Sequence, residues 1–396
     1  MIDRREILDT ASLVSLNAHV VEKDYVLGWM LAGIEAHAEL KDSWMFKGGT
    51  CLKKCFFETW RFSEDLDFTL LNPAHIDEKF LKRVFSEIGQ WVYEESGIDT
   101  PTNIQNFDIY ENPRGGLSCQ GKIGYRGPIS PQGKNIPRIK IDLTSDELLV
   151  QPPVRSAVFH PYSDAPHDGI QALTYSYAEA FGEKIRALAE RTRPRDLYDV
   201  INLFRNASAR PAASLLLDIL CQKCAFKNIA IPSLADLAPH RANLDASWQN
   251  MLAHQLPALL PVESFWNELP AFFAWLEGGA DPNMPPAYAV GSDETVLRDR
   301  FLKLSVTASV SSCIEVIRFA AFNRHCVELD YRDENGRRTT KIIEPYSLRQ
   351  TTAGAILLYV YDVEKNVDNT VHIDRIGGVR VTSKTFIPRY EIELIP

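Results

Sequence analysis

Two glycines and two aspartates, separated by a short stretch, constrain this chain more than any other part of its sequence. The string Lys47-Gly48-Gly49-Thr50 is followed, after fourteen residues, by Asp65-Leu66-Asp67. In the run DLDFTLL the aspartates first alternate with apolar residues, which is typical of a strand with one buried face. Two carboxylates at positions i and i+2 of a strand point the same way, and they repel each other unless a cation lies between them. The pattern therefore predicts a strand that offers two acids to a cation.

Hard oxygen ligands of this kind suit Mg²⁺, which keeps several waters and shares the oxygens of a substrate phosphate. The two glycines let backbone N–H groups approach a phosphate chain, and Thr50 adds a hydroxyl. A third strand carboxylate, Asp142 in the run RIKIDLT, completes a two-metal clamp for an in-line phosphoryl displacement. A lone Asp-x-Asp is usually a solvated strand face and a lone Gly-Gly is usually a turn. The combination of these elements in this order favours a functional site.

The charge balance limits how such a chain meets a nucleic acid. The sequence has 43 basic and 52 acidic residues, a net charge of −9, so a broad basic coating surface is excluded while a local basic groove is not. Seven cysteines, an odd number, do not form a disulfide framework in a chain of this length. The N-terminus lacks the apolar core of a secretory signal, and no apolar run is long enough for a membrane span. We therefore expect a cytoplasmic protein with no membrane partner.

The hydrophobic pattern divides the chain into regions. Helical periodicity over the first 40 residues is followed by short strand-like runs, with an amphipathic helix at 80–92, and helical periodicity returns from 175 to about 277. A Gly/Pro-rich stretch at 278–293 indicates a linker. The predicted domains are a catalytic core, a helical lobe that completes the active site, a linker with a connecting helix, and a small β-rich domain, at 1–150, 151–280, 281–312 and 313–396.

The β-rich end contains one clear hairpin signal. The letters ENG stand between two runs of alternating apolar residues, VELDY and TTKII. Further short runs follow at close spacing, which is typical of a small sheet or barrel.

The string FKGGTCLKK…RFSEDLDFTL resembles the motif of the DNA polymerase β-like nucleotidyltransferase superfamily, and more narrowly that of the AbiEii/AbiGii nucleotidyltransferase toxins. Three further strings fit that toxin family: VVEKDYVLGWML, EKIRALAER and RPRDLYDVINL. The resemblance covers roughly residues 15–210. It implies an α+β fold in which a mixed sheet with helices is joined to a helical second lobe.

The resemblance also implies roles for particular residues. The nucleoside triphosphate is expected to bind at Lys47, Gly48, Gly49, Thr50, Ser63 and Arg195. Mg²⁺ or Mn²⁺ is expected on Asp65 and Asp67, with Asp142 as the third metal carboxylate. Lys184 is expected to meet triphosphate oxygens, and Asp199 to act as the base or to orient the acceptor hydroxyl. The basic run from Lys184 to Arg195 is a candidate surface for the RNA backbone.

The C-terminal string LDYRDENGRRTTKIIEPYSLRQ…VHIDRIGG resembles a WYL domain, which implies a small Sm-like β-barrel that senses ligands or nucleic acid. The chain departs from this family at its signature, where Ile356-Leu357-Leu358 replaces Trp-Tyr-Leu. Arg332, Arg349 and Arg375 lie on matching strings and are candidates for binding a ligand or nucleic acid, since guanidinium groups suit phosphate.

Two functions remain open from the sequence. The first is a Mg-dependent nucleotidyltransferase of a toxin–antitoxin or antiviral defence system. Such an enzyme transfers NMP from an NTP to RNA, with the tRNA 3′ end as first candidate and an antitoxin protein as partner. The alternative is a regulatory protein that senses nucleotide or nucleic acid through an inactive transferase fold and the WYL-like domain.

Overall fold

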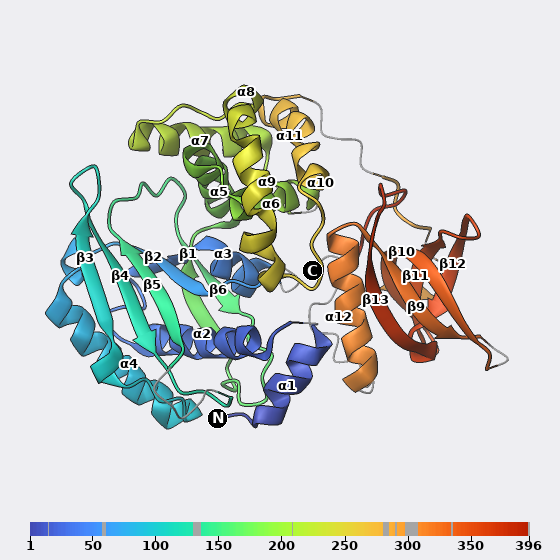
Figure 1. Ribbon diagram of the computed structural model, residues 1–396, viewed down its shortest axis with the longest axis horizontal. Coiled ribbons are helices and arrows are strands. Elements are labelled where there is room, and N and C mark those ends of the chain that lie inside the picture. The colour runs from blue at the N-terminus through green and yellow to red at the C-terminus, as the bar shows by residue number, and fades with distance from the viewer. Residues whose placement is uncertain are drawn as a thin grey trace.

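The computed structural model describes residues 1–14, 16–57, 61–129, 136–207, 209–279, 285–289, 291–297, 308–333 and 336–394. Figure 1 shows a sheet with helices, a helical lobe and a second sheet at the C-terminal end. The expected α+β class is confirmed.

The first half of the chain builds a mixed sheet in the order β3-β4-β5-β2-β1-β7-β6. Its strands are β1 (Trp44–Lys47), β2 (Asp65–Leu70), β3 (Asn106–Glu111), β4 (Leu117–Gly124), β5 (Arg138–Thr144), β6 (Val154–Val158) and β7 (Ile170–Thr174). The β2/β5 and β1/β7 pairs are parallel, whereas the other neighbours run antiparallel. The sheet thus continues to Thr174, beyond the boundary expected at residue 150, because β7 pairs beside β1.

One face of this sheet is covered by α1 (Arg4–Leu13), α2 (Ala18–Ala36) and α4 (Glu78–Ser96), the last being the helix predicted at 80–92. The amphipathic pattern explains α4, because its apolar residues recur every three or four positions and are buried. Asp77 caps its first turn by accepting from the Phe80 N–H, and Gly97 ends it in the left-handed conformation. Alternate strand residues such as Phe68 and Ile141 join this core, so Asp67 and Asp142 face the opposite side.

The opposite face, called here the site face, meets the helical lobe only in part. The lobe consists of α5 (Tyr177–Arg191), α6 (Pro194–Arg205), α7 (Ala213–Lys227), α8 (Leu234–Leu237), α9 (Arg241–Leu252), α10 (Glu263–Trp266) and α11 (Leu269–Leu276). Its apolar core includes Met45 from β1 and packs against Leu173 from β7. Helical structure from 175 to 277 is confirmed.

The C-terminal part is an antiparallel sheet preceded by a helix, α12 (Ala308–Phe322). The strands are β8 (Glu294–Val296), β9 (His325–Arg332), β10 (Arg338–Thr351), β11 (Ile356–Asp362), β12 (Val367–His372) and β13 (Ile376–Thr385), in the order β12-β11-β10-β9-β13 with β8 on β10. The predicted hairpin is confirmed, since Arg332 pairs with Arg338 across the turn.

Two expectations for this end of the chain need correction. In the described residues β12 and β13 are edges that do not pair with each other, so the sheet is open and the expected Sm-like barrel is not confirmed. The predicted linker is also more structured than a linker, although 280–284 and 290 lie outside the described residues. Tyr288 is buried against Tyr346, and β8 adds a strand to the sheet because Arg349 pairs with Val296.

The C-terminal part packs directly on the helical lobe, with α12 between them (Figure 1). Phe319 and Phe322 of α12 belong to the apolar core of the lobe. Just beyond α12, Asn323 accepts a 2.8 Å hydrogen bond from the Tyr198 hydroxyl on α6. Arg324 pairs with Glu268 at 2.9 Å.

Candidate active site

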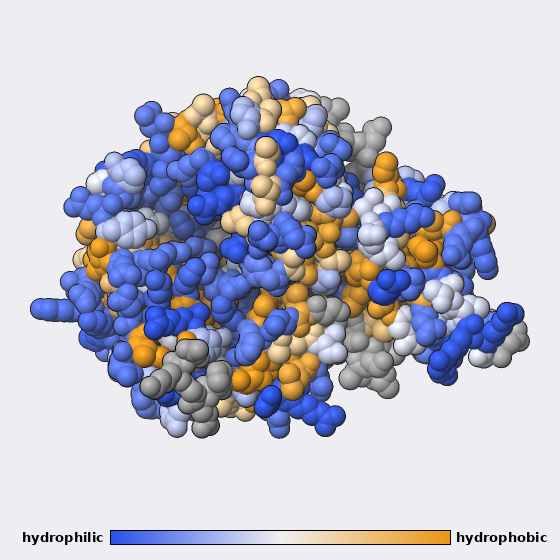
Figure 2. Space-filling view, viewed as in Figure 1, coloured by the Kyte–Doolittle hydropathy of each residue, from blue (hydrophilic) through white to orange (hydrophobic). Residues whose placement is uncertain are grey.

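A hollow of about 310 Å³ lies where the helical lobe meets the site face of the mixed sheet. Figure 2 shows this side of the molecule as largely hydrophilic, with a recess between the lobe and the sheet. Most residues predicted from the sequence line the hollow: Lys47, Gly48, Gly49, Ser63, Asp65, Asp67, Asp142, Lys184 and Arg195. Thr50 and Asp199 are not among the lining residues.

Three carboxylates come together because of strand register. Asp65 and Asp67 alternate with the buried Leu66 and Phe68 on β2, so both acids face the hollow. The parallel pairing of β2 with β5 places Asp142 directly beside Asp67. Burial and then the Asp142 charge raise the pKa of Asp67 to about 6, and burial also raises the pKa of Asp65. These raised values mark an excess of negative charge that a cation would relieve.

The glycine pair is explained by close approach. Gly48 has φ +83°, and a Cβ there would lie 2.1 Å from Asp67 Oδ2. A Cβ on Gly49 would lie 2.6 Å from Arg61 Nη2. The two glycines open α3 (Gly48–Cys51), which continues as a π-helical turn at Leu52–Phe56. A side chain at either position would collide with the site, so the backbone can lie against the hollow only as glycine.

Thr50 lies outside the hollow. Its side chain is fully buried, and its hydroxyl donates a 2.5 Å hydrogen bond to the carbonyl of Asp65. The residue therefore ties α3 to β2, which replaces the expected contact between its hydroxyl and a triphosphate.

Asp199 is also placed differently from the expectation. Arg61 donates two hydrogen bonds to its carboxylate, at 2.9 and 2.8 Å, and Lys184 lies 2.6 Å away. Asp199 is 0% exposed; burial alone would raise its pKa, but Arg61 and Lys184 lower it to about 2. A general base needs access to the reacting proton and a pKa near the working pH, and Asp199 has neither. Its geometry is that of a group that positions Lys184.

Arg61 is the functional candidate that the sequence reading left without a role. It lines the hollow, occupies the space that a Gly49 Cβ would enter, and donates to Gln255 at 3.1 Å. The only sequence signal was its place two residues before Ser63, because its partner Asp199 is 138 residues away.

Four arginines of the helical lobe line the hollow and are called here its basic wall: Arg186, Arg191, Arg193 and Arg195. Two of them form ion pairs with acids of the same lobe. Arg186 bonds to Glu183 and Glu190, and Arg191 bonds to Asp196. Arg193 and Arg195 also line the hollow but make no ion pair with a described residue. Burial, and then the Arg61 charge, lower the pKa of Arg195, so an incoming anion would stabilise its cation.

Lys47 is held at the sheet end of the hollow by an acidic neighbour. Its ammonium lies 3.4 Å from Glu147, and although burial opposes it, the charges of Tyr175 and Glu147 raise the pKa of Lys47. Lys47 therefore stays charged and faces the acids.

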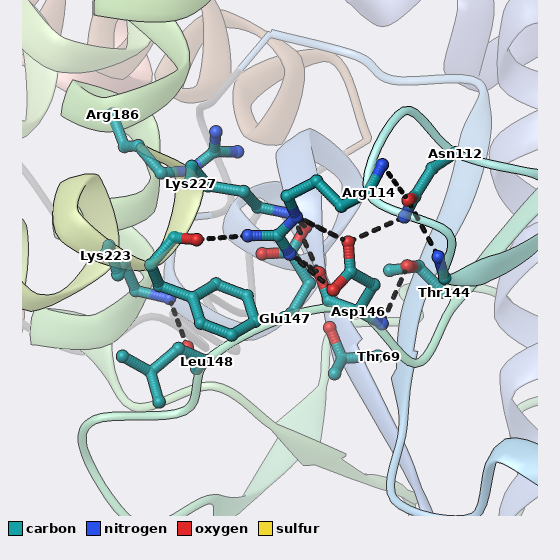
Figure 3. A network of polar contacts seen from close by, with 12 residues as sticks. Thr69, Asn112, Arg114, Thr144, Asp146, Glu147, Leu148, Arg186, Lys223 and Lys227 are labelled. Atoms are coloured by element: carbon teal, nitrogen blue, oxygen red, sulfur yellow. Dashed lines mark hydrogen bonds and ion pairs between the residues drawn. The ribbon is translucent and has the colours of Figure 1, made fainter. Parts of the chain in front are cut away.

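Figure 3 shows a polar network that joins the sheet to the lobe beside this position. Arg114, from the β3–β4 turn, pairs with Asp146 and donates to the carbonyl of Phe226 on α7. Lys227 of α7 lies 3.2 Å from Glu147, the partner of Lys47. The network braces α7 against the end of β5 and was not foreseen from the sequence.

Of the three candidate arginines of the C-terminal domain, Arg349 is set apart from the other two by its burial. Arg349 is 0% exposed, donates to the carbonyls of Tyr288 and Ala289, and lies 4.2 Å over the ring of Tyr359. It is thus a structural residue of the sheet and cannot meet a ligand. Arg332 is exposed at the end of β9, and Arg375 is half-buried in the 3₁₀ turn Ile373–Arg375.

No group of three or more His, Cys, Asp or Glu side chains in the described part of the chain is arranged to hold a metal ion by itself. Mg²⁺ is usually bound through one or two carboxylates together with substrate phosphates. Asp65 and Asp67 supply such a pair on one face of β2. Among the described helices, none has the length and apolar character needed to cross a membrane.

Two family models match the chain. The family model described as nucleotidyl transferase AbiEii toxin, Type IV TA system, matches residues 29–277, and the model of the WYL domain matches residues 312–381. No curated protein sequence matches the chain.

Two solved structures are similar to the chain. MenT4, a nucleotidyltransferase toxin from Mycobacterium tuberculosis H37Rv, shares 19% identity over 71% of this chain and 91% of its own, with a TM-score of 0.43. Proteasome accessory factor B/C (PafBC) of Arthrobacter aurescens shares 12% identity over 49% of this chain and 32% of its own, with a TM-score of 0.19.

The mixed sheet with its helical lobe and the matching family model define a nucleotidyltransferase. More narrowly, the chain belongs to the AbiEii nucleotidyltransferase toxin family, whose model covers more than half of it, and it carries a WYL domain at its C-terminal end.

Proposed function

We propose that this protein transfers a nucleoside monophosphate from an NTP to a hydroxyl of an RNA acceptor and releases pyrophosphate. The observation that carries the proposal is that Asp67 lies beside Asp142 and directly against the backbone of Gly48. Acids, a close-approach glycine and a basic wall in one hollow suit a polyphosphate and the metal that accompanies it.

Each group has a distinct task in this proposal. The N–H groups at Gly48 and Gly49 and the cations Lys184 and Arg195 bind the triphosphate. Asp65 and Asp67 hold Mg²⁺ or Mn²⁺, and Asp142, which lies beside Asp67, is not assigned to the metal in this proposal. When bound, the metal supplies charge neutralisation at the reacting phosphate.

The reaction then follows in-line displacement. The acceptor hydroxyl oxygen forms a bond to the α-phosphorus while the bond to the pyrophosphate oxygen breaks. Since Asp199 is held by Arg61 and Lys184, we assign receipt of the hydroxyl proton to Asp142, which lies toward the open side of the sheet. Asp199 keeps Lys184 in place throughout.

The family's description as the toxin of a type IV toxin–antitoxin system supports an antitoxin partner and a role in defence. The 3′ end of tRNA remains the first acceptor to test.

The test is transfer of label. Purified protein with α-labelled NTPs, Mg²⁺ and total RNA is expected to label RNA, and Asp67→Asn is expected to abolish the signal. Equal labelling by both proteins would overturn the proposal. In host cells, induced wild type is expected to arrest growth while Asp67→Asn does not. Arrest by both proteins would favour a binding protein with an inactive transferase fold.

A further inference from the structure

The site face continues beyond the three acids as an open surface of β5 and β4. Strand register sets out rows across it: Asp67 lies beside Asp142, which pairs with Gln120. In the next row, Asp65 lies beside Lys140, which pairs with Lys122. A row with two acids, Asp67 and Asp142, thus lies next to a row with two lysines, Lys140 and Lys122.

The basic row extends along β5. Arg138 is two residues before Lys140, so both side chains share the site face with Asp142. Arg138 and Lys140 are exposed and Lys122 is half-buried. Arg138 also lines a second hollow, of about 820 Å³, together with Lys23 and His254. We call Lys122, Lys140 and Arg138 the basic track.

The basic track lacks the ion pairs that neutralise other cations of the protein. Lys122 and Lys140 stand directly opposite each other on neighbouring strands, and none of the three forms an ion pair with a described residue. Like charges in this position are destabilising. Lys140 lies beside Asp65, and it helps to hold down the pKa of that carboxyl against the larger effect of burial. Such an arrangement becomes favourable when an outside anion lies across it.

The basic run on α5 and α6 does not offer the same surface. Lys184 is committed to Asp199, Arg186 to Glu183 and Arg191 to Asp196. These cations form the wall of the hollow. Arg193 and Arg195 make no ion pair with a described residue, but both line the hollow itself, so a polyanion outside the hollow would meet the basic track on the sheet.

We propose that the basic track binds the phosphate backbone of the RNA acceptor and leads its reactive end to Asp65, Asp67 and Asp142. The inference rests on the proposed transfer reaction and adds the path by which the acceptor arrives. Cations two residues apart on β5 repeat at roughly 6.6 Å, a spacing that suits successive phosphates of an extended strand. On the outer strand of the same face, Tyr110 is 52% exposed and offers a ring on which a base can stack.

The test removes these charges without replacing any residue that lines the hollow. The variant combines Lys122→Gln, Lys140→Gln and Arg138→Gln. The matched control combines Lys41→Gln, Lys79→Gln and Lys82→Gln. All three lysines are exposed, and Lys79 and Lys82 lie on α4, the helix that covers the other face of the sheet. The probe is fluorescently labelled total tRNA, titrated with full-length protein at several salt concentrations.

We expect the track variant to bind roughly tenfold to a hundredfold more weakly near 0.1 M salt, and the slope of log K against log[salt] to fall by about 2. The control variant should match wild type. Thermal shift with Mg²⁺ and each NTP should be the same for all three proteins, which shows that the hollow is intact.

The outcomes separate this inference from the proposed reaction. Equal affinity and slope in the wild type and the track variant would overturn the basic track, even if the wild type transfers nucleotides. Salt-dependent binding that is lost only in the track variant would support it, even if no transfer to tRNA is seen. Absence of tRNA binding by the wild type at low salt would overturn it outright.

Discussion

The Arg61 guanidinium holds both oxygens of the Asp199 carboxylate, at 2.9 and 2.8 Å, and both residues are almost completely buried. The pair links the segment before β2 to α6 across 138 residues of sequence, and Lys184 joins it at 2.6 Å. The helical lobe is thereby tied to the segment that leads into the acids of β2.

Removing one partner of this pair should cost both stability and activity. Arg61→Ala removes two hydrogen bonds to the buried Asp199 carboxylate, so we expect the free energy of unfolding to fall by about 3–5 kcal/mol. Arg61→Lys keeps the charge but loses the two-bond geometry, so it should recover part of the stability and less of the transfer rate. Urea unfolding and single-turnover transfer measure the two effects. Wild-type stability in Arg61→Ala would contradict the role assigned to the pair.

Gly48 should be intolerant of a side chain because of what lies next to it. We expect Gly48→Ala to abolish transfer, since its Cβ would fall 2.1 Å from Asp67 Oδ2 and push that carboxylate away. Gly354→Ala is a matched control, because Gly354 has a similar φ of +85° but nothing within 4 Å. In both variants the left-handed backbone lowers the stability of the folded protein by about 1–2 kcal/mol. Transfer should therefore be lost in one and kept in the other.

The acids should make stability depend on pH in the absence of metal. Asp67 has a folded pKa of about 6, raised from 3.8, so the folded state binds more protons than the unfolded state between these values. Stability then falls as the pH rises from about 4 to above 6. Asp67→Asn should remove this loss and be more stable than wild type at pH 8, by at most roughly 3 kcal/mol. Melting temperatures from pH 4 to 8 in chelator test this; identical profiles would argue against the shift.

Divalent metal and NTP should stabilise the protein together. A ligand that binds the folded state raises its stability by about 2.7 kcal/mol at a hundredfold excess over Kd. We expect Mg²⁺ alone to shift the melting temperature little, because no ready set of three ligands is present in the described residues. Mg²⁺ with NTP should shift it clearly, and Asp65→Asn should reduce that shift. If NTP in the presence of a chelator gave the full shift in melting temperature, the proposed role of the metal in NTP binding would be contradicted.

Local patterns made much of this architecture predictable. Alternation identified the strand that carries Asp65 and Asp67, and the run RIKIDLT identified the strand that carries Asp142. The toxin-family resemblance, the helical stretch from 175 to 277 and the C-terminal hairpin are confirmed.

What the sequence could not provide depends on contacts between distant segments. Nothing around Thr50 indicates that its hydroxyl is used by the carbonyl of Asp65. The sequence makes Arg349 a candidate for ligand binding, but its guanidinium donates hydrogen bonds to the carbonyls of Tyr288 and Ala289, about 60 residues earlier in the chain. Whether β12 and β13 meet is likewise a question of sheet curvature, which short strand patterns do not contain.

The hydrogen bond from Tyr198 to Asn323 has a practical consequence for anyone who wishes to dissect this protein. Tyr198 precedes Asp199 on α6, and Phe319 and Phe322 fill the apolar core of the same lobe. A protein truncated before residue 308 would lose Phe319 and Phe322 and would expose apolar surface on the lobe. The loss would also loosen α6, the helix that carries Asp199. The C-terminal domain thus stabilises the helical lobe of the enzyme. Truncated proteins should aggregate or lose activity even if this domain senses no ligand.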